Sequence, residues 1–344
     1  QGRGQEAIVA SCFSSTIGTV FGAGCYLLLA WPLIEIALKF GPPEFFWLGI
    51  FALTIIGSLA GDSILKGLAG GAIGLLIMTG IIWSTGGFLI KLIPWSPLAI
   101  AGIRSGFTAI IIFFYSRPNS IKFDKNTWYG AVCYALMVIS FVMGNKLTTS
   151  GNVILIQYAA PVYVALFGYS FLGERSTKID WTAIAIILTG LSCFFLEELS
   201  FSELWGNVFA LFSGIGFAGL TLFMRKQKNA KPIDSVLVGN LITFLLCAPF
   251  YVGGITYDPI PWMYISFLGF FQLGLAYVLY SIAIKHVSAL DAIIYPVVEP
   301  ILNPILAFIF LNEAMSGTAQ LGGILVLLGV VGRGLFKESS SKKK

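Results

Sequence analysis

The chain has 344 residues, of which 57% are hydrophobic and 11% charged, and its mean hydropathy is +0.88. Soluble domains carry about 25% charged residues, so this composition excludes a soluble protein and predicts a membrane protein. With a single histidine and no C-x-x-C pair among five cysteines, we expect no His-based catalysis, no metal and no cofactor, and the net charge of +5 does not point to nucleic acid.

Residues 1–70 form the first predicted domain and carry two hydrophobic segments, Ala7–Ala30 and Phe45–Ala60. The first contains Gly18-x-x-x-Gly22, a pattern of small residues that suits close helix packing in membranes. We therefore predict about two extra N-terminal membrane helices.

From Gly71 the chain becomes a dense series of apolar spans with short loops, and about 20 residues suffice to cross a bilayer. Ten spans are predicted: Gly71–Ile90, Leu98–Tyr115, Trp128–Asn145, Asn152–Leu172, Trp181–Leu196, Trp205–Met224, Ser235–Val252, Trp262–Ala283, Ala289–Leu311 and Ala319–Leu335. The predicted fold class is an all-α polytopic membrane protein.

The basic residues of the loops predict the orientation. Fifteen lie in the even-numbered loops and the tail, against two, Lys91 and Lys146, in the odd-numbered loops. The fifteen are Arg117, Lys122, Lys125, Arg175, Lys178, Arg225, Lys226, Lys228, Lys231, Lys285, Arg333, Lys337, Lys342, Lys343 and Lys344. Because cytoplasmic loops are rich in Lys and Arg, we expect both termini in the cytoplasm.

The two halves of the ten-span block resemble each other at an offset of 139 residues. This shift places Pro161 on Pro300, Gly190 on Gly329, and Leu172-Gly173-Glu174 on Leu311-Asn312-Glu313. Five spans is an odd number, so the second unit would enter the membrane upside down relative to the first. We predict inverted repeats over 71–198 and 199–336, followed by a basic cytoplasmic tail at 337–344, and such repeats place the substrate site near the midplane.

The ninth span holds Tyr295-Pro296-Val297-Val298-Glu299-Pro300 in the middle of an apolar run. Each proline removes a backbone donor and opens the helix, and a charge at mid-membrane costs at least about 2.5–3.5 kcal/mol on insertion scales. Such features persist where they face protein or a water-filled cavity. The sequence predicts helix breaks at Pro161, Pro296 and Pro300.

Residues 71–336 resemble the EamA-type transporters of the drug/metabolite transporter superfamily. The resemblance rests on Gly80-Ile81-Ile82-Trp83-Ser84-Thr85-Gly86-Gly87, on Gln157-Tyr158-Ala159-Ala160-Pro161, and on Val298-Glu299-Pro300. It implies ten helices in two inverted five-helix units and alternating-access transport of small metabolites, often amino acids. The family often has Glu before the proline in both halves, whereas the first half here has Ala160.

Residues 1–70 resemble a fragment of the large membrane subunit of tripartite tricarboxylate transporters, through Gly2-Arg3-Gly4-Gln5-Glu6-Ala7 and Ala37–Phe45. That subunit is much longer, so its own transport site is incomplete here. We interpret the fragment as a natural fusion, a remnant or an assembly join, and as a packing appendage.

Seven residues are candidates for substrate binding or coupling: Glu299, Trp83, Tyr158, Gln157, Tyr295, Arg104 and Tyr280. Glu299 either binds a substrate amine or a proton, or satisfies backbone groups freed by the prolines. Arg104 either clamps a substrate carboxylate, pairs with Glu299, or snorkels to the outer headgroups. The aromatic candidates line the cavity or belong to the core or the lipid-facing surface. Gln157, like Gln272, meets substrate or bonds across helices.

We therefore expect a secondary transporter of small polar metabolites, amino acids or related compounds, that acts in efflux across the cytoplasmic (inner) membrane. The expected partners are a small-molecule substrate, the lipid bilayer and protons as the coupling ion, with the chain acting as a monomer or homodimer. The alternative is an accessory or structural subunit of a larger transporter. A membrane-embedded enzyme is disfavoured, because it would need a constellation of catalytic side chains that one histidine and one clear intramembrane carboxylate do not supply.

Overall fold

The computed structural model describes residues 64–117, 124–194, 203–302 and 317–341. Both predicted N-terminal helices, Glu313 and the end of the tail lie outside these residues. Within them the regular structure is helical, and seven segments are long and apolar enough to cross a membrane. The prediction of an all-α polytopic membrane protein is confirmed.

The first half contains α3 (Ile64–Trp83), α4 (Gly86–Leu92), α5 (Pro97–Ser116), α6 (Lys125–Leu147), α7 (Ser150–Gln157), α8 (Ala160–Leu172) and α9 (Lys178–Phe194). The second half contains α10 (Leu204–Lys226), α11 (Ile233–Cys247), η1 (Ala248–Phe250), α12 (Pro259–Phe267), η2 (Leu268–Leu275), α13 (Ala276–Ala283), α14 (Ala289–Ile294), η3 (Tyr295–Val297) and α16 (Gly317–Ser341).

Local sequence signals explain where several helices begin. The side chains of Ser96, Asp124, Thr149 and Ser288 each accept a hydrogen bond from a backbone N–H in the first turn of α5, α6, α7 and α14. These caps satisfy donors that the helix leaves free. Gly173 ends α8 with a φ of 73°, which glycine adopts without steric cost.

Four predicted spans are interrupted. The first has a turn between α3 and α4, and the fourth has one at Tyr158-Ala159, just before Pro161 in α8. The ninth passes through the 3₁₀ turn η3, which contains Pro296, and helical backbone resumes at Val298. The eighth contains the π-helical η2, which the sequence analysis did not predict.

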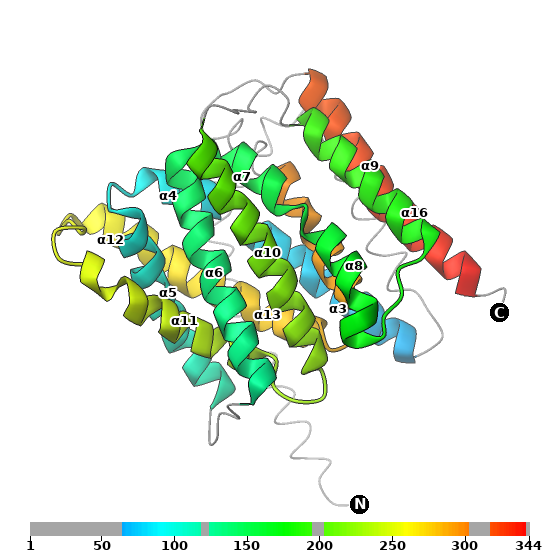
Figure 1. Cartoon of the computed structure of the whole chain (residues 1–344), viewed down its shortest axis with the longest axis horizontal. Coiled ribbons are helices and arrows are strands. Elements are labelled where there is room, and N and C mark those ends of the chain that lie inside the picture. The colour runs from blue at the N-terminus through cyan, green and yellow to red at the C-terminus, as the bar shows by residue number, and fades with distance from the viewer. Residues whose placement is uncertain (1–63, 118–123, 195–202, 303–316, 342–344) are drawn as a thin grey trace, which may run out of the picture. The chain divides into compact units, whose positions relative to one another are not determined.

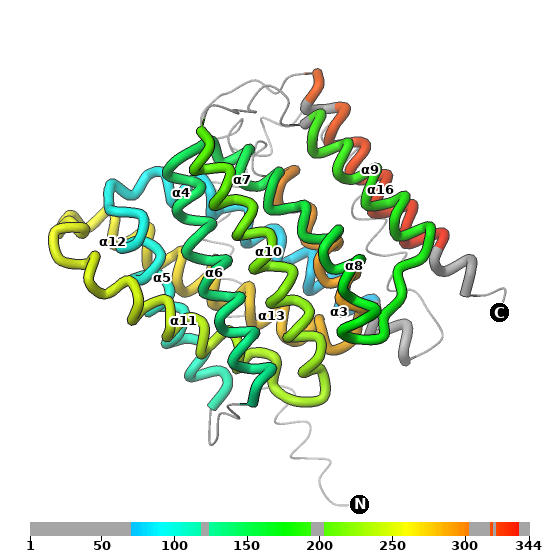
Figure 2. Tube along the Cα trace, viewed as in Figure 1, coloured from blue at the N-terminus to red at the C-terminus, as the bar shows by residue number. Residues whose placement is uncertain are grey.

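The elements pack across the two halves of the sequence. Figure 2 shows α6 and α10 running side by side, and they are in contact, as are α5 with α11 and α3 with α13. Helices α9 and α16 form a pair at one edge of Figure 1. Gly190 makes that pair close, since a Cβ there would lie 2.8 Å from the carbonyl oxygen of Gly322.

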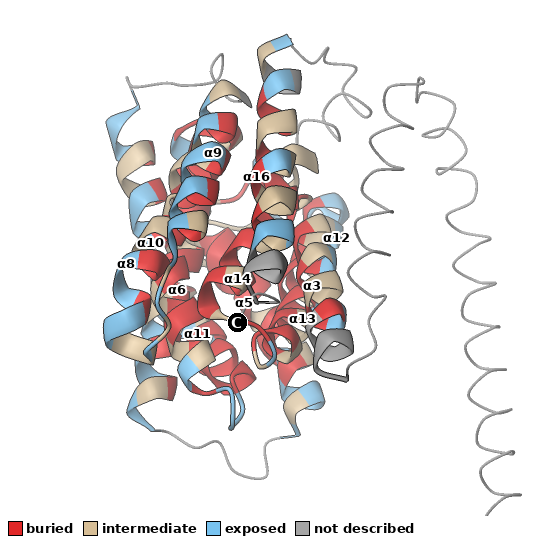
Figure 3. Ribbon diagram, turned by 90° about the vertical axis from the view of Figure 1, so that its right-hand side faces the viewer, coloured by how far each residue is buried: buried red, intermediate tan, exposed pale blue. Residues whose placement is uncertain are grey.

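Buried residues gather between the helices (Figure 3), and many large apolar residues are exposed. Phe114 is 71% exposed and Leu245 68% exposed. Soluble proteins rarely expose contiguous apolar surface of this kind, whereas lipid tails are as apolar as these side chains. The outer surface is therefore that of a protein in a bilayer.

Candidate functional site

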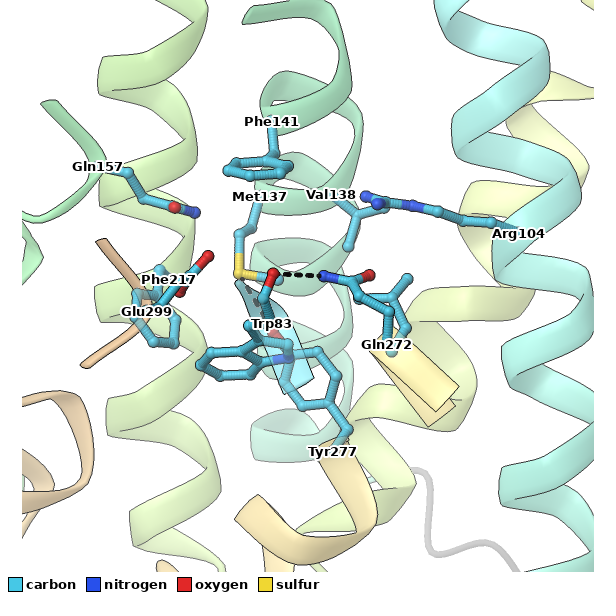
Figure 4. A pocket seen from close by; sticks show the side chains of 11 residues that line it. Trp83, Arg104, Met137, Val138, Phe141, Gln157, Phe217, Gln272, Tyr277 and Glu299 are labelled. Atoms are coloured by element: carbon cyan, nitrogen blue, oxygen red, sulfur yellow. Dashed lines mark hydrogen bonds between the residues drawn. The ribbon is translucent and has the colours of Figure 1, made fainter. Parts of the chain in front are cut away.

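A cavity of about 40 Å³, lined by buried residues, lies between the two halves of the chain (Figure 4). Four predicted residues line it: Trp83, Arg104, Gln157 and Glu299. The other lining residues are Met137, Val138, Phe141, Phe217, Gln272, Leu273 and Tyr277. The volume suffices for water but lies far below the roughly 300–1,000 Å³ of sites for small molecules.

Glu299 reaches this cavity from the helix that resumes after η3. Glu299 is 6% exposed, and the Tyr158 hydroxyl lies within hydrogen-bond distance of two acceptors, Glu299 Oε2 (3.0 Å) and the carbonyl oxygen of Pro296 (2.9 Å). Tyr158 itself follows directly on α7, at the break before Pro161. The break at Tyr158-Ala159 and the 3₁₀ turn η3 are thus joined by one side chain.

Arg104 lies on the opposite wall, in α5. The Thr108 hydroxyl donates to the carbonyl oxygens of Arg104 (2.9 Å) and Gly269 (2.8 Å), which fixes α5 against η2. The Arg104 side chain is 1% exposed and lines the cavity, so the interpretation that it snorkels to the headgroups is wrong. No ion pair in the described residues joins it to Glu299.

Several buried polar atoms at the cavity have no hydrogen-bond partner. They are Nε and Nη1 of Arg104, Nε1 of Trp83 and Oε1 of Gln272. Gln272 sits in η2, and its Nε2 makes only a long bond of 3.5 Å to the carbonyl oxygen of Trp83. Buried polar atoms without partners are rare in native proteins, so this cluster indicates a place where a ligand or water binds.

Aromatic rings form one side of the cavity. The Trp83 ring lies 5.2 Å from that of Tyr277 and 5.6 Å from that of Phe217, in tilted and edge-on arrangements. Tyr280 packs behind Trp83 with ring centroids 5.6 Å apart, and its hydroxyl is 2.9 Å from that of Thr221. These rings provide a rigid apolar surface with polar edges.

Gln157 is tied across helices and also lines the cavity. Its Nε2 donates to the Ser213 hydroxyl (2.8 Å), which donates in turn to the carbonyl oxygen of Met137 (3.1 Å). The bond across helices that was one alternative for Gln157 is therefore present, and contact of Gln157 with substrate stays a prediction.

The remaining predicted residues lie outside the lining. Tyr158 and Tyr280 are buried behind it, and Tyr295 faces α16, where its hydroxyl would be 3.9 Å from a Cβ on Gly334. The sequence analysis left the role of Gln272 open between substrate contact and a bond across helices, and it did not identify Tyr277. Tyr277 lies three residues before Tyr280, about one helical turn, but nothing local distinguished it from the other aromatic residues.

Ion pairs tie the two halves together away from the cavity. Arg225 Nε donates to Glu174 Oε1 (2.8 Å), and Glu174 Oε2 accepts from the backbone N–H of Ala289 at the start of α14 (2.8 Å). Arg333 donates to Oδ1 of Asp180 (2.8 Å) and of Asp291 (2.5 Å).

Asp180 and Asp291 have equivalent roles at two helix starts. Oδ2 of each carboxylate accepts from a hydroxyl three residues earlier, Thr177 for α9 and Ser288 for α14. Asp291 and Ser288 form a capping box at the start of α14.

Comparisons with known proteins place this geometry in context. The family model of EamA-like transporters matches residues 70–196 and 204–333, and that of the tripartite tricarboxylate transporter TctA family matches residues 1–89.

Similar proteins carry only general names. An uncharacterized transporter of Archaeoglobus fulgidus is 22% identical over 263 residues, covering 74% of this chain and 93% of the relative. The uncharacterized transporter YwfM of Bacillus subtilis is 24% identical over 275 residues, covering 74% and 91%. A solved crystal structure of a protein shares the fold with a TM-score of 0.65 at 17% identity, covering 77% of this chain and 98% of the other.

Proposed function

Because the chain belongs to the EamA-like transporter family, we propose that it is a secondary active transporter of small polar metabolites, namely amino acids or related compounds. The observation that carries the proposal is the cavity itself. It holds a carboxylate and a guanidinium on opposite walls, together with buried polar atoms that have no protein partner. Intramembrane ionisable groups of this kind mark transport pathways.

The packing supports two inverted repeats. Under the offset of 139 residues, the contact between α6 and α10 corresponds to the contact between α13 and α3, and both are present. The contact of α11 with α6 likewise corresponds to that of α5 with η2. The offset also pairs Gly190 with Gly329, and both lie in the interface of α9 and α16. We assign the repeats to 71–198 and 199–336.

The small cavity requires movement during transport. At about 40 Å³ it does not admit an amino acid in this conformation, so the surrounding helices have to separate. The ion pairs of Arg225 with Glu174 and of Arg333 with Asp180 join the two halves, and the loop charges assign these residues to the cytoplasmic side. We propose that they close that side and break when it opens.

Glu299 is the proposed coupling carboxylate. The single proton of the Tyr158 hydroxyl is within reach of two acceptors, Glu299 Oε2 and the carbonyl oxygen of Pro296. If Glu299 is protonated, it donates to the Tyr158 oxygen while Tyr158 donates to Pro296. If Glu299 is ionised, it accepts from Tyr158. Both protonation states thus have a hydrogen-bonded arrangement, as a proton carrier requires.

The bilayer, the substrate and the proton are the proposed partners, with the chain acting as a monomer or homodimer in the cytoplasmic (inner) membrane. The orientation, with both termini cytoplasmic, rests on the loop charges. Export as the direction rests on the family resemblance. Residues 1–70 are proposed to act as a packing appendage.

The test uses purified protein in liposomes. A pH gradient is imposed, and the movement of a broad panel of radiolabelled amino acids is measured. Glu299→Gln should abolish transport driven by the gradient. Exchange of labelled for unlabelled substrate, which needs no net proton movement, should persist if the carboxylate serves coupling alone and fall if it also binds the substrate amine.

Glu203→Gln is the matched control, because Glu203 is exposed and makes no capping hydrogen bond. A wild-type chain that moves no member of the panel would contradict the proposed function. Gradient-driven transport that Glu299→Gln leaves unchanged would contradict the role of Glu299.

A further inference from the structure

Arg104 is a buried cation for which the described residues supply no counterion. Its side chain is 1% exposed, Nε and Nη1 have no hydrogen-bond partner, and the ion pairs in this part of the chain belong to Arg225 and Arg333. An arginine does not become neutral to avoid the cost of burial, because its guanidinium stays protonated in proteins. Its charge therefore has to be matched by something that enters the cavity.

The position of the Arg104 guanidinium indicates which chemical group enters the cavity. Figure 4 shows Arg104 reaching toward the cavity from one side and Glu299 from the other, with Gln272 beside the guanidinium. Nε and Nη1 of the planar guanidinium group have no hydrogen-bond partner. A guanidinium presents paired N–H donors in a fork that matches the two oxygens of a carboxylate. One guanidinium carries one positive charge, and a carboxylate balances it with one negative charge.

We propose that Arg104 binds the carboxylate of the transported substrate and so restricts the cavity to metabolites that carry one. This inference rests on the proposed function and adds the chemical group that the site selects. An amine of the same shape that lacks the carboxylate would leave the guanidinium desolvated and unpaired. Hydrogen bonds to charged groups make a difference of about 10- to 100-fold in binding, so the amine should be a poorer substrate by that factor.

The first measurement needs no variant. Wild-type protein in liposomes is tested with matched pairs of probes, L-leucine with 3-methylbutylamine and L-phenylalanine with 2-phenylethylamine, each amine being the amino acid without its carboxylate. Transport of the amino acid should exceed that of its amine at least about 10-fold. Equal transport of both members of a pair would overturn the inference while leaving the proposed function intact.

Variants then assign the selectivity to Arg104. Arg104→Gln should raise KM for the amino acid at least about 10-fold and leave transport of the amine unchanged, so that the ratio between them falls. Arg104→Lys keeps the charge without the fork and should retain part of the preference. Arg117→Gln is the control on the same helix, because Arg117 is exposed at the end of α5.

Two further results would count against the inference. If Arg104→Gln lowers transport of acid and amine by the same factor, Arg104 has a structural role and the inference is wrong. If the wild-type chain moves neither the amino acids nor the amines, the proposed function fails and this inference fails with it. Should Arg104→Gln not yield monodisperse protein, the wild-type pairs and Arg104→Lys decide the question.

Discussion

Replacing Arg333 by methionine should strongly destabilise the contact between α9, α14 and α16. The Arg333 side chain is 1% exposed and donates to two carboxylates, Asp180 at 2.8 Å and Asp291 at 2.5 Å. Methionine fills much of the same volume but leaves both carboxylates without their cation. The change therefore tests the charge contacts more than the packing.

The expected loss is about 3–5 kcal/mol, the range for removing one partner of a buried ion pair. Most of it should come from Asp180, whose side chain is 4% exposed, whereas that of Asp291 is 15% exposed and keeps some contact with water. Arg333→Lys should lose less stability than Arg333→Met, because it keeps the charge. Some loss should remain, because lysine cannot donate through two separate nitrogens in a fixed fork.

The assay is thermal unfolding of the purified protein in detergent, followed by tryptophan fluorescence. A double-mutant cycle with Asp180→Asn isolates the pair, since asparagine keeps an oxygen for the Thr177 hydroxyl. The double variant should be more stable than the sum of the two single losses predicts, by about 0.5–3 kcal/mol. Strictly additive losses, or a midpoint unchanged in Arg333→Met, would refute this account of the network.

Two further predictions concern helix packing and capping. Gly190→Ala should cost about 1–3 kcal/mol of stability, because its Cβ would lie 2.8 Å from backbone atoms of α16. The control Gly332→Ala should be neutral or slightly stabilising, because its Cβ would meet nothing within 4 Å. Equal midpoints of the two variants in thermal unfolding would contradict the close approach of α9 and α16. Asp124→Ala should cost about 1 kcal/mol through loss of the α6 cap, for which a backbone N–H donates at 2.7 Å. Hydrogen bonds from the Thr127 hydroxyl and backbone N–H lower the pKa of Asp124 below its usual 3.8. The stabilisation by this cap is therefore present at neutral pH and is lost as the pH falls through the lowered pKa. Unfolding midpoints of wild type and Asp124→Ala over a pH series check this, and a difference between them that stays constant to pH 2 would contradict it.

Part of the candidate site could be predicted from local sequence. Glu299 and the prolines stand out because a charge and missing backbone donors are costly in an apolar run, and that cost can be recognised without a fold. Trp83 and Gln157 were identified by the motifs that contain them. Tyr277 and Met137 could not be found this way, because an aromatic or a methionine in a hydrophobic helix is the usual composition of such a helix.

The fate of Arg104 depended on tertiary structure. Its place two turns into a span allowed an anchor at the headgroups, a partner for Glu299 or a cavity residue, and sequence did not separate them. The contact of α5 with η2, fixed by Thr108, turns the side chain inward. Tyr295 shows the opposite case, because it adjoins Pro296 in sequence yet faces α16.

Hydropathy by itself determines a polytopic helical protein, because this signal is local and is set by the bilayer. The motifs that contain Trp83, Pro161 and Glu299 indicate the transporter family. The cavity is different in kind. It forms where helices distant in sequence meet, beside helix breaks that the prolines predict and a π-helical segment that they do not predict. Only the tertiary structure could therefore decide that the carboxylate and the guanidinium face one cavity without pairing, since that depends on how the helices are turned toward one another.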